Sequence, residues 1–188
     1  MWDEFQGTVD MVLHLGMADG WDFYSMEEHA FKEGFTSTFW SARGEKQEYY
    51  MTHDDVGKTI KDLKRSEGRD MWSDAPMGLT TTINVNKAVV SCMQVLNPGD
   101  ESDSDAKKRI IKVKPHHEAG PYCCGFIYYE SLATCWRRGL KTKVMFCHVP
   151  GDSDQESLER GRDVVLAMIG AVSLQIVDNV GREYKVQV

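Results

Sequence analysis

Residues 119–150 constrain the fold of this chain more than any other stretch. They begin with a turn and an adjacent cysteine pair, and an apolar-striped helix is predicted at 122–138. A short basic link then leads to a predicted buried strand at 143–149, which carries His148 near its end. In an α/β fold, helix N-termini and strand C-termini lie at the same edge of the sheet. The thiol of Cys124 and the imidazole of His148 are therefore expected to converge.

These residue types suit nucleophilic catalysis. A cysteine in the first turn of a helix lies at the positive end of the helix dipole, which favours the thiolate over the thiol. His148 can accept the thiol proton, and a carboxylate, Glu27 or Glu28, can hold the imidazole in one tautomer. The pattern alone leaves Cys123 and Cys124 open as the nucleophile. It also fits a cysteine packed in the core and a histidine bonded at a strand end.

The other predicted strands and helices follow one another in the order of an α/β fold. Outside 119–150, strands are predicted at 8–15, 79–85, 109–114 and 182–188, and helices at 87–96, capped by Asn86, and after a capping box at Ser153 and Glu156. A further capping box at 25–28 suits a surface helix turn. The fold class expected is a three-layer α/β/α domain with a mostly parallel central sheet. The whole chain, 1–188, is expected to form one domain with a long excursion at 36–75, whose aromatic residues either pack it down or bind a ligand.

Composition argues against several classes of protein. The formal net charge of −7 disfavours nucleic acid as a partner. No apolar run reaches the roughly 18 residues that a membrane-spanning helix needs, and the first residues do not resemble a signal peptide. Five cysteines, an odd number without disulfide spacing, predict reduced thiols in the cytoplasm. Cys92, Cys135 and Cys147 are interpreted as core residues. No metal or other cofactor is expected, because the adjacent pairs at 116–117 and 123–124 suit a tetrahedral zinc site poorly.

Two motifs resemble a known family. Ala119-Gly120-Pro121-Tyr122-Cys123-Cys124 is similar to the A-G-x-Y-x-C segment of pyroglutamyl-peptidase I, a family of cysteine peptidases. Phe146-Cys147-His148-Val149-Pro150 resembles the F-x-H-V-P strand end of the same family, and the stretch around Phe23-Tyr24-Ser25-Met26-Glu27 is similar to its divergent fungal branch. The resemblance implies Cys124 as nucleophile, His148 as base and Glu27 as orienting acid. It implies removal of N-terminal pyroglutamate from peptides, without a cofactor.

The chain also departs from the family pattern. The family normally opens with a strand followed by a G-F-x-P-F loop and an N-P-S stretch, and this chain begins after that point, so the opening strand is expected to be missing. Met17 stands where many members carry a glutamine that faces the substrate. The resemblance thus implies Met17 and Tyr122 as substrate-binding residues. The alternative is a catalytically silent or truncated domain of the same family that acts as a binding protein.

Overall fold

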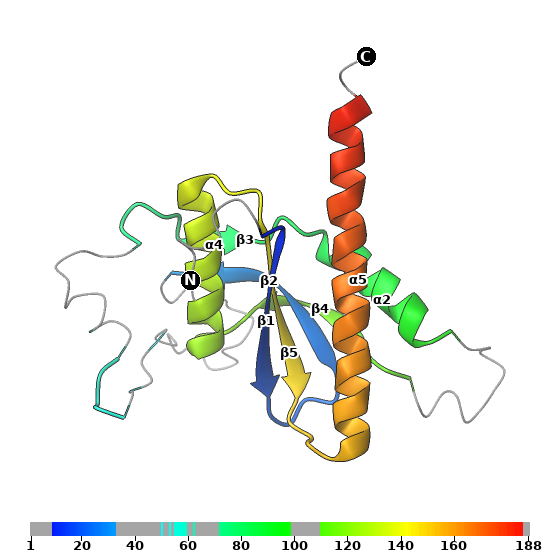
Figure 1. Cartoon of the computed structure of the whole chain (residues 1–188). Coiled ribbons are helices and arrows are strands. Elements are labelled where there is room, and N and C mark those ends of the chain that lie inside the picture. The colour runs from blue at the N-terminus through cyan, green and yellow to red at the C-terminus, as the bar shows by residue number, and fades with distance from the viewer. Residues whose placement is uncertain are drawn as a thin grey trace. The chain divides into compact units, whose positions relative to one another are not determined.

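The computed structural model describes residues 9–32, 50, 53, 55–59, 62, 72–98 and 110–185, with the side chains of the last helix described through residue 177. Within these residues, five strands and three helices form a mixed α/β fold with a central sheet (Figure 1). The strands are β1 (Met11–Ala18), β2 (Tyr24–Phe31), β3 (Gly78–Thr80), β4 (Val113–Glu118) and β5 (Lys143–Pro150). The helices are α2 (Val85–Leu96), α4 (Cys123–Arg138) and α5 (Gln155–Lys185). The predicted α/β class is confirmed, and most of the excursion at 36–75 lies outside the described residues.

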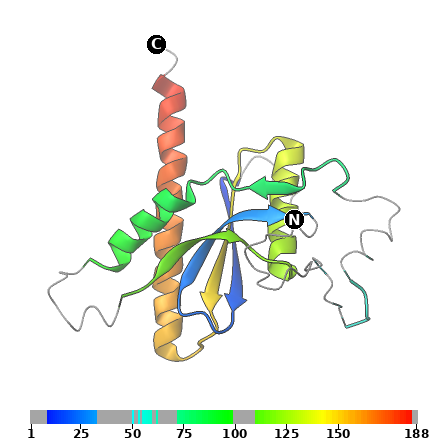
Figure 2. The same ribbon diagram turned by 180° about the vertical axis from the view of Figure 1, so that it is seen from behind.

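The sheet places β2 between strands that come from distant parts of the sequence. Hydrogen-bonded neighbours follow the order β1-β5-β2-β3, and β4 also pairs with β2. Figure 2 gives the view of the strands from behind. β2 runs antiparallel to both β3 and β5. In the β2–β5 ladder, Ser25 lies opposite His148 and Met26 opposite Cys147. The continuous apolar strands did not predict this reversal of direction.

The helix turn expected at 25–28 is wrong, because these residues form part of strand β2. The side chains from Tyr24 to Glu27 are all buried, and the strand has hydrogen-bonded neighbours in the sheet. Every buried backbone N–H and C=O needs a partner, and neighbouring strands supply partners along the whole segment. A capping box satisfies only a few such groups at one end of a helix. The tertiary pairing therefore outweighs the local signal.

Several other boundaries also differ from the prediction, among them the strand predicted at 109–114, which is β4 at Val113–Glu118. The strand expected at 79–85 is limited to β3, because Asn84 caps helix α2 by accepting a hydrogen bond from the N–H of Lys87 at 2.9 Å. The edge strand expected at 182–188 is also wrong through Lys185, since α5 continues to that residue. Residues 186–188 lie outside the described part. Asp154, rather than Ser153, accepts the bond from the Ser157 N–H at the start of α5.

The chain divides into two compact units, and the first contains helix α4. This unit comprises Met1–Val12, Glu28–Thr81 and His117–Phe146. Aromatic residues dominate its core, including Tyr50, Trp72, Tyr128, Tyr129 and Phe146. The Tyr50 hydroxyl donates to the Phe31 carbonyl at 2.5 Å, and the Trp72 indole N–H bonds the Glu130 carboxylate. These two aromatic residues of the excursion therefore pack it down, which was one of the two roles left open for them.

The second unit contains helices α2 and α5. It comprises Leu13–Glu27, Thr82–His116 and Cys147–Val188. The two helices pack together, and each contributes small or apolar buried side chains, including Val85, Ala88, Val89 and Cys92 from α2 and Val164, Met168, Ala171 and Val172 from α5. Gln175 of α5 joins them further, because its side chain bonds both the backbone N–H and the carbonyl of Asn84.

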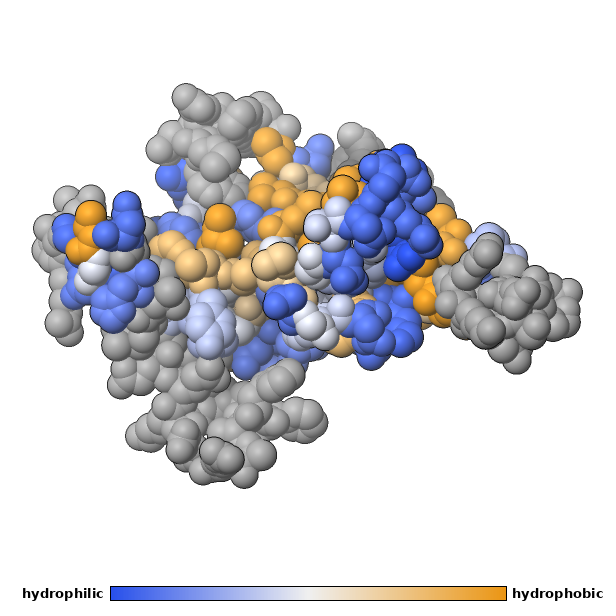
Figure 3. Space-filling model, turned by 90° about the horizontal axis from the view of Figure 1, so that it is seen from below, coloured by the Kyte–Doolittle hydropathy of each residue, from blue (hydrophilic) through white to orange (hydrophobic). Residues whose placement is uncertain are grey.

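The first turns of α5 are strongly polar. Arg160 pairs with Glu156 at 3.0 Å and Arg162 with Asp163 at 2.8 Å. Figure 3, which views Figure 1 from below, shows hydrophilic atoms gathered near the end at which α5 begins.

Among the described residues, no helix, α5 included, has the length and apolar character needed to cross a membrane.

Candidate active site

Glu27 and His148 meet within the second unit. The alternation of side chains along a strand places Ser25 and Glu27 on one face of β2, and Ser25 lies opposite His148 of β5. Glu27 is thus a diagonal neighbour of His148, within reach of a long side chain. The His148 Nδ1 lies 2.8 Å from Glu27 Oε1, and both residues are buried. The structure therefore brings together two of the three residues expected to be catalytic.

The hydrogen bond determines which nitrogen of His148 carries the proton. A carboxylate can only accept, so Nδ1–H of His148 donates to Glu27. In the neutral ring, Nε2 then holds the lone pair that can accept a proton. An orienting acid is expected to make such a bond, and Glu27 rather than Glu28 makes it.

Glu27 has two more partners, which the sequence did not single out. Nδ1 of His116, on strand β4, lies 2.6 Å from Glu27 Oε2. The Ser25 hydroxyl donates to Oε1. His116 falls after the strand predicted at 109–114, but in the structure it lies on β4, which pairs with β2. Recognising residues 24–31 as a strand would have placed Ser25 beside Glu27, whereas no local pattern indicated His116.

Trp21 lies against both imidazoles. Its ring centroid is 5.1 Å from that of His116 and 5.5 Å from that of His148. Trp21 also stacks on Phe23 at 4.5 Å, and the Lys114 ammonium lies 4.2 Å from the centre of the Phe23 ring. The two histidines are therefore held on one side by the Glu27 carboxylate and contacted by one large aromatic ring.

The charge of Glu27 is maintained by its partners. Burial removes water from the carboxylate, which by itself would raise its pKa. Hydrogen bonds from His116, His148 and Ser25, with the charge of His116, act in the opposite direction and outweigh burial. The pKa of Glu27 is consequently below its ordinary value of 4.5. A charged carboxylate beside His148 favours the imidazolium that forms when the ring accepts a proton.

Glu27→Gln is expected to weaken the dependence of unfolding free energy on pH as the pH falls below about 4.5, the ordinary pKa of this carboxyl group. A carboxylate whose pKa is lowered by folding stabilises the fold above its unfolded pKa. This contribution is lost as the pH falls through the folded pKa, so wild type should lose stability more steeply than the variant. Urea unfolding at several pH values measures both slopes.

The control is Asp74→Asn, since Asp74 also has a lowered pKa but pairs with Arg137 on the surface, where solvent screens the interaction. Its slope should stay closer to that of wild type. Equal slopes for wild type and Glu27→Gln would contradict the charged state assigned to Glu27.

Cys124 lies in the first turn of α4, in the first unit. It is the second residue of the helix, half-buried and packed against the aromatic core, whereas the preceding Cys123 is exposed. The first N–H groups of a helix have no partner within the helix, and Tyr122 at the N-cap makes no side-chain capping bond. These N–H groups point toward the region in front of the helix, where an anion is favoured.

The turn before α4 is held by close backbone contact. Gly120 has a φ of 83°, a conformation that L residues with a side chain rarely adopt. A Cβ added at Gly125 would overlap the carbonyl oxygen of Gly120, and the Tyr50 hydroxyl would lie 3.5 Å away. The start of the helix and the preceding turn therefore fit together only with glycine at position 125.

The other three cysteines are unsuited to nucleophilic chemistry. Cys92, Cys135 and Cys147 are buried, as expected for core residues. Burial raises the pKa of Cys92 to about 11 and that of Cys135 above its ordinary value. Burial, with the nearby charge of Glu27, also raises the pKa of Cys147. All three therefore stay protonated near neutral pH.

The two residues expected to bind substrate are both exposed. Met17 is on β1 in the second unit and is 64% exposed, and Tyr122 precedes α4 in the first unit and is 60% exposed. Exposure at this level leaves each side chain accessible to a ligand. Their role in binding stays a prediction.

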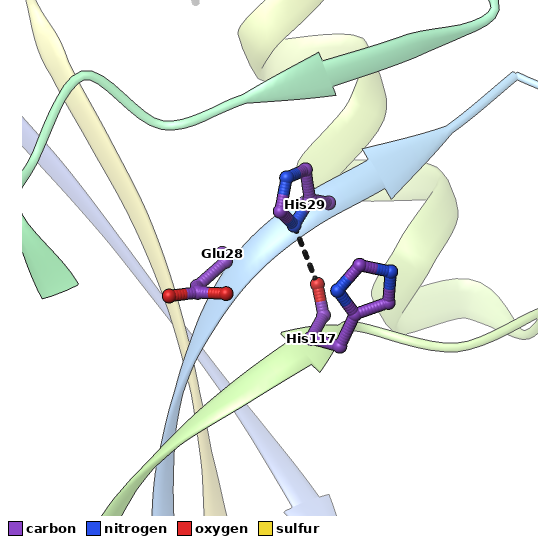
Figure 4. Close-up of side chains that lie close together, drawn as sticks. All are labelled: Glu28, His29 and His117. Atoms are coloured by element: carbon purple, nitrogen blue, oxygen red, sulfur yellow. Dashed lines mark hydrogen bonds between the residues drawn. The ribbon is translucent and has the colours of Figure 1, made fainter. Parts of the chain in front are cut away.

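Among the described residues, one group of side chains could hold a cation. Ligand atoms of Glu28, His29 and His117 all lie within 4.8 Å of one another (Figure 4). Nδ1 of His29 donates to the His117 carbonyl at 2.9 Å, as the dashed line in Figure 4 marks. His29 could therefore ligate a cation only through Nε2, because Nδ1 carries the donated proton. The hydrogen bond between Glu27 and His148 does not involve any of these three side chains.

Comparison with known proteins finds similarity in structure alone. No family model matches the sequence, and no curated protein matches it. The structure is similar to the pyrrolidone carboxyl peptidases of Pyrococcus furiosus (18% identity, TM-score 0.59) and Thermococcus litoralis (15% identity, TM-score 0.59), and to the pyroglutamyl peptidase I of Bacillus amyloliquefaciens (16% identity, TM-score 0.57). The matches cover 89%, 93% and 87% of this chain and 70%, 68% and 65% of those chains, respectively. The chain therefore has the fold of the pyroglutamyl peptidases.

Proposed function

We propose that the chain is a cysteine-type omega peptidase that removes pyroglutamate from the N-terminus of peptides. Cys124 is the nucleophile, His148 the general base and acid, and Glu27 the residue that orients His148. The observation that carries the proposal is the buried hydrogen bond of 2.8 Å from His148 Nδ1 to Glu27. The cysteine in the first turn of α4 and the fold shared with the solved peptidases support it.

The reaction consists of two transfers of the pyroglutamyl group, first to Cys124 and then to water. His148 Nε2 takes the proton of the Cys124 thiol, and the thiolate attacks the carbonyl carbon of the pyroglutamyl residue. As the tetrahedral intermediate collapses, the C–N bond breaks and the imidazolium returns its proton to the leaving amine. Water, deprotonated by His148, then attacks the thioester, and pyroglutamate leaves as the Cys124 thiol is regenerated. Both transfers require the Cys124 thiol to reach His148.

Charge develops at two places during each transfer. The carbonyl oxygen becomes an oxyanion, which backbone N–H groups in the first turn of α4 are suited to stabilise. His148 becomes an imidazolium, which the negative charge of Glu27 stabilises through the bond at Nδ1. The proposed residues thus supply a partner for each charge, and the route needs no cofactor.

The proposed substrates are peptides with N-terminal pyroglutamate, and the proposed compartment is the cytoplasm. The lactam ring is uncharged and compact, so its recognition depends on hydrogen bonds to the ring and on apolar contact. Met17 and Tyr122 are the proposed contacts, and neither brings a charge. A reducing compartment would keep the Cys124 nucleophile as a thiol.

The test is release of a fluorescent amine from its pyroglutamyl amide by the purified chain. The prolyl amide serves as the comparison substrate, because its five-membered ring lacks the lactam carbonyl and its ring nitrogen is a protonated amine instead of a neutral amide. Release from the pyroglutamyl amide that is at least tenfold faster than from the prolyl amide is expected, since a site that bonds a polar group discriminates strongly against a substrate without it. Pyroglutamyl hydrolysis at the rate of buffer alone would contradict the proposal.

A further inference from the structure

Two histidines share the carboxylate of Glu27. His148 Nδ1 lies 2.8 Å from Oε1, and His116 Nδ1 lies 2.6 Å from Oε2. The Glu27 side chain is fully buried, while those of His116 and His148 are 19% and 10% exposed. The three residues come from β2, β4 and β5, all in the second unit at these positions. His116 is therefore built into the same polar cluster as the proposed base.

The bond at Oε2 restricts the carboxylate in a way that the bond at Oε1 cannot. A carboxylate held at one oxygen can still turn about its terminal C–C bond, for which rotamer preferences are broad. A donor at the second oxygen sets the plane of the group. Because the His116 N–H occupies Oε2, the other oxygen is directed at His148 Nδ1. The Ser25 hydroxyl donates to Oε1 and so also helps to hold the carboxylate in this orientation.

Trp21 connects the two imidazoles on a second side. It contacts His116 at 5.1 Å and His148 at 5.5 Å between ring centroids. Movement of either ring would disturb its contact with Trp21 as well as its bond to Glu27. The two histidines are thus coupled through one carboxylate and one aromatic ring.

We propose that His116 is a positioning residue of the proposed peptidase, whose Nδ1–H fixes the Glu27 carboxylate so that Glu27 orients His148. This role rests on the proposed function, but the state of the His148 ring can be measured whether or not the chain hydrolyses peptides. Removal of a group that holds a functional side chain in position typically lowers activity by about 10- to 100-fold.

Two substitutions separate the hydrogen bond from the shape of the ring. His116→Phe keeps a ring beside Trp21 but removes the donor. His116→Asn loses most of the ring but places an amide N–H near the position of Nδ1. The control is His117→Phe, which changes the adjacent, exposed histidine. Thermal unfolding of each variant reports whether it is folded.

We expect His116→Phe to lower kcat for the pyroglutamyl amide by about 10- to 100-fold with little change in KM. His116→Asn should recover most of that loss, and His117→Phe should match wild type. ¹⁵N NMR of the imidazoles should show His148 in the Nδ1–H tautomer in wild type and in His116→Asn. His116→Phe should show a mixture of tautomers.

Unchanged kcat and an unchanged His148 tautomer in His116→Phe would overturn the proposal, as would equal losses in the Phe and Asn variants. If His116→Phe does not fold, loss of the Nδ1–H tautomer in His116→Asn also overturns it. A wild type that lacks peptidase activity but shows the expected tautomers would contradict the proposed function and leave the positioning of His148 supported.

Discussion

Cys124→Ala is expected to lower kcat/KM for a pyroglutamyl amide by about 10³-fold or more, because removal of a covalent nucleophile leaves only binding and oxyanion stabilisation. Cys123→Ala should remain within about threefold of wild type, since loss of a side chain that takes no part in the reaction removes no transition-state contact. The two cysteines are adjacent and both lie in the first turn of α4. The pair is therefore a close comparison, in which helix position is nearly constant while the direction and the exposure of the thiol differ.

The measurement is steady-state release of fluorescent amine by equal amounts of folded protein. Circular dichroism and thermal unfolding should first show that both variants keep the wild-type fold. Loss of activity in Cys123→Ala with retention in Cys124→Ala would reassign the nucleophile. Retention in both would contradict the assignment of Cys124 as the required nucleophile.

Gly125→Ala is expected to destabilise the fold by about 2–3 kcal/mol, because it inserts a methyl group where backbone leaves no room. The added Cβ would overlap the Gly120 carbonyl oxygen, and a backbone atom cannot turn aside as a flexible side chain can. Gly120 cannot relieve the overlap easily, since it already has a φ of 83° in the turn. Either α4 or the turn must shift.

The matched control is Gly170→Ala in helix α5. A Cβ at Gly170 meets no atom within 4 Å, and alanine favours helix over glycine by about 1 kcal/mol. Gly170→Ala should therefore be neutral or more stable than wild type. Urea unfolding of the three proteins gives the comparison, and a Gly125→Ala variant as stable as Gly170→Ala would refute the close contact.

The sequence predicted those parts of the fold whose signals are local. Helix α4 and its end at Gly139, in a left-handed conformation with φ of 62°, follow from the apolar stripe and the glycine that stops it. Strand β5 follows from its continuous apolar run, and His148 is at the position expected near its end. The family resemblance implies Glu27 as the orienting acid, whereas the spacing alone left Glu28 equally suitable.

The remainder depends on contacts that distant segments make with one another. Residues 24–31 combine polar, acidic and aromatic side chains, and only pairing with β3, β4 and β5 makes them a strand. His116 lies far from Glu27 in the sequence and meets it because β4 pairs with β2. No periodicity within a short window contains that information. The sequence likewise did not indicate that Trp72, a residue of the predicted excursion, packs into an aromatic core.

The pairing of Ser25 with His148 makes the hydrogen bond between Glu27 and His148 a reporter of how the chain folds. A shift of β5 by one residue against β2 would place Cys147 or Val149 opposite Ser25 and turn the imidazole to the other face of the sheet. Such a misfolded chain could keep all its helices and still lack the bond between Glu27 and His148. The Nδ1–H resonance of His148 should therefore emerge during refolding only with the correctly paired sheet, later than the helical signal of α4 and α5.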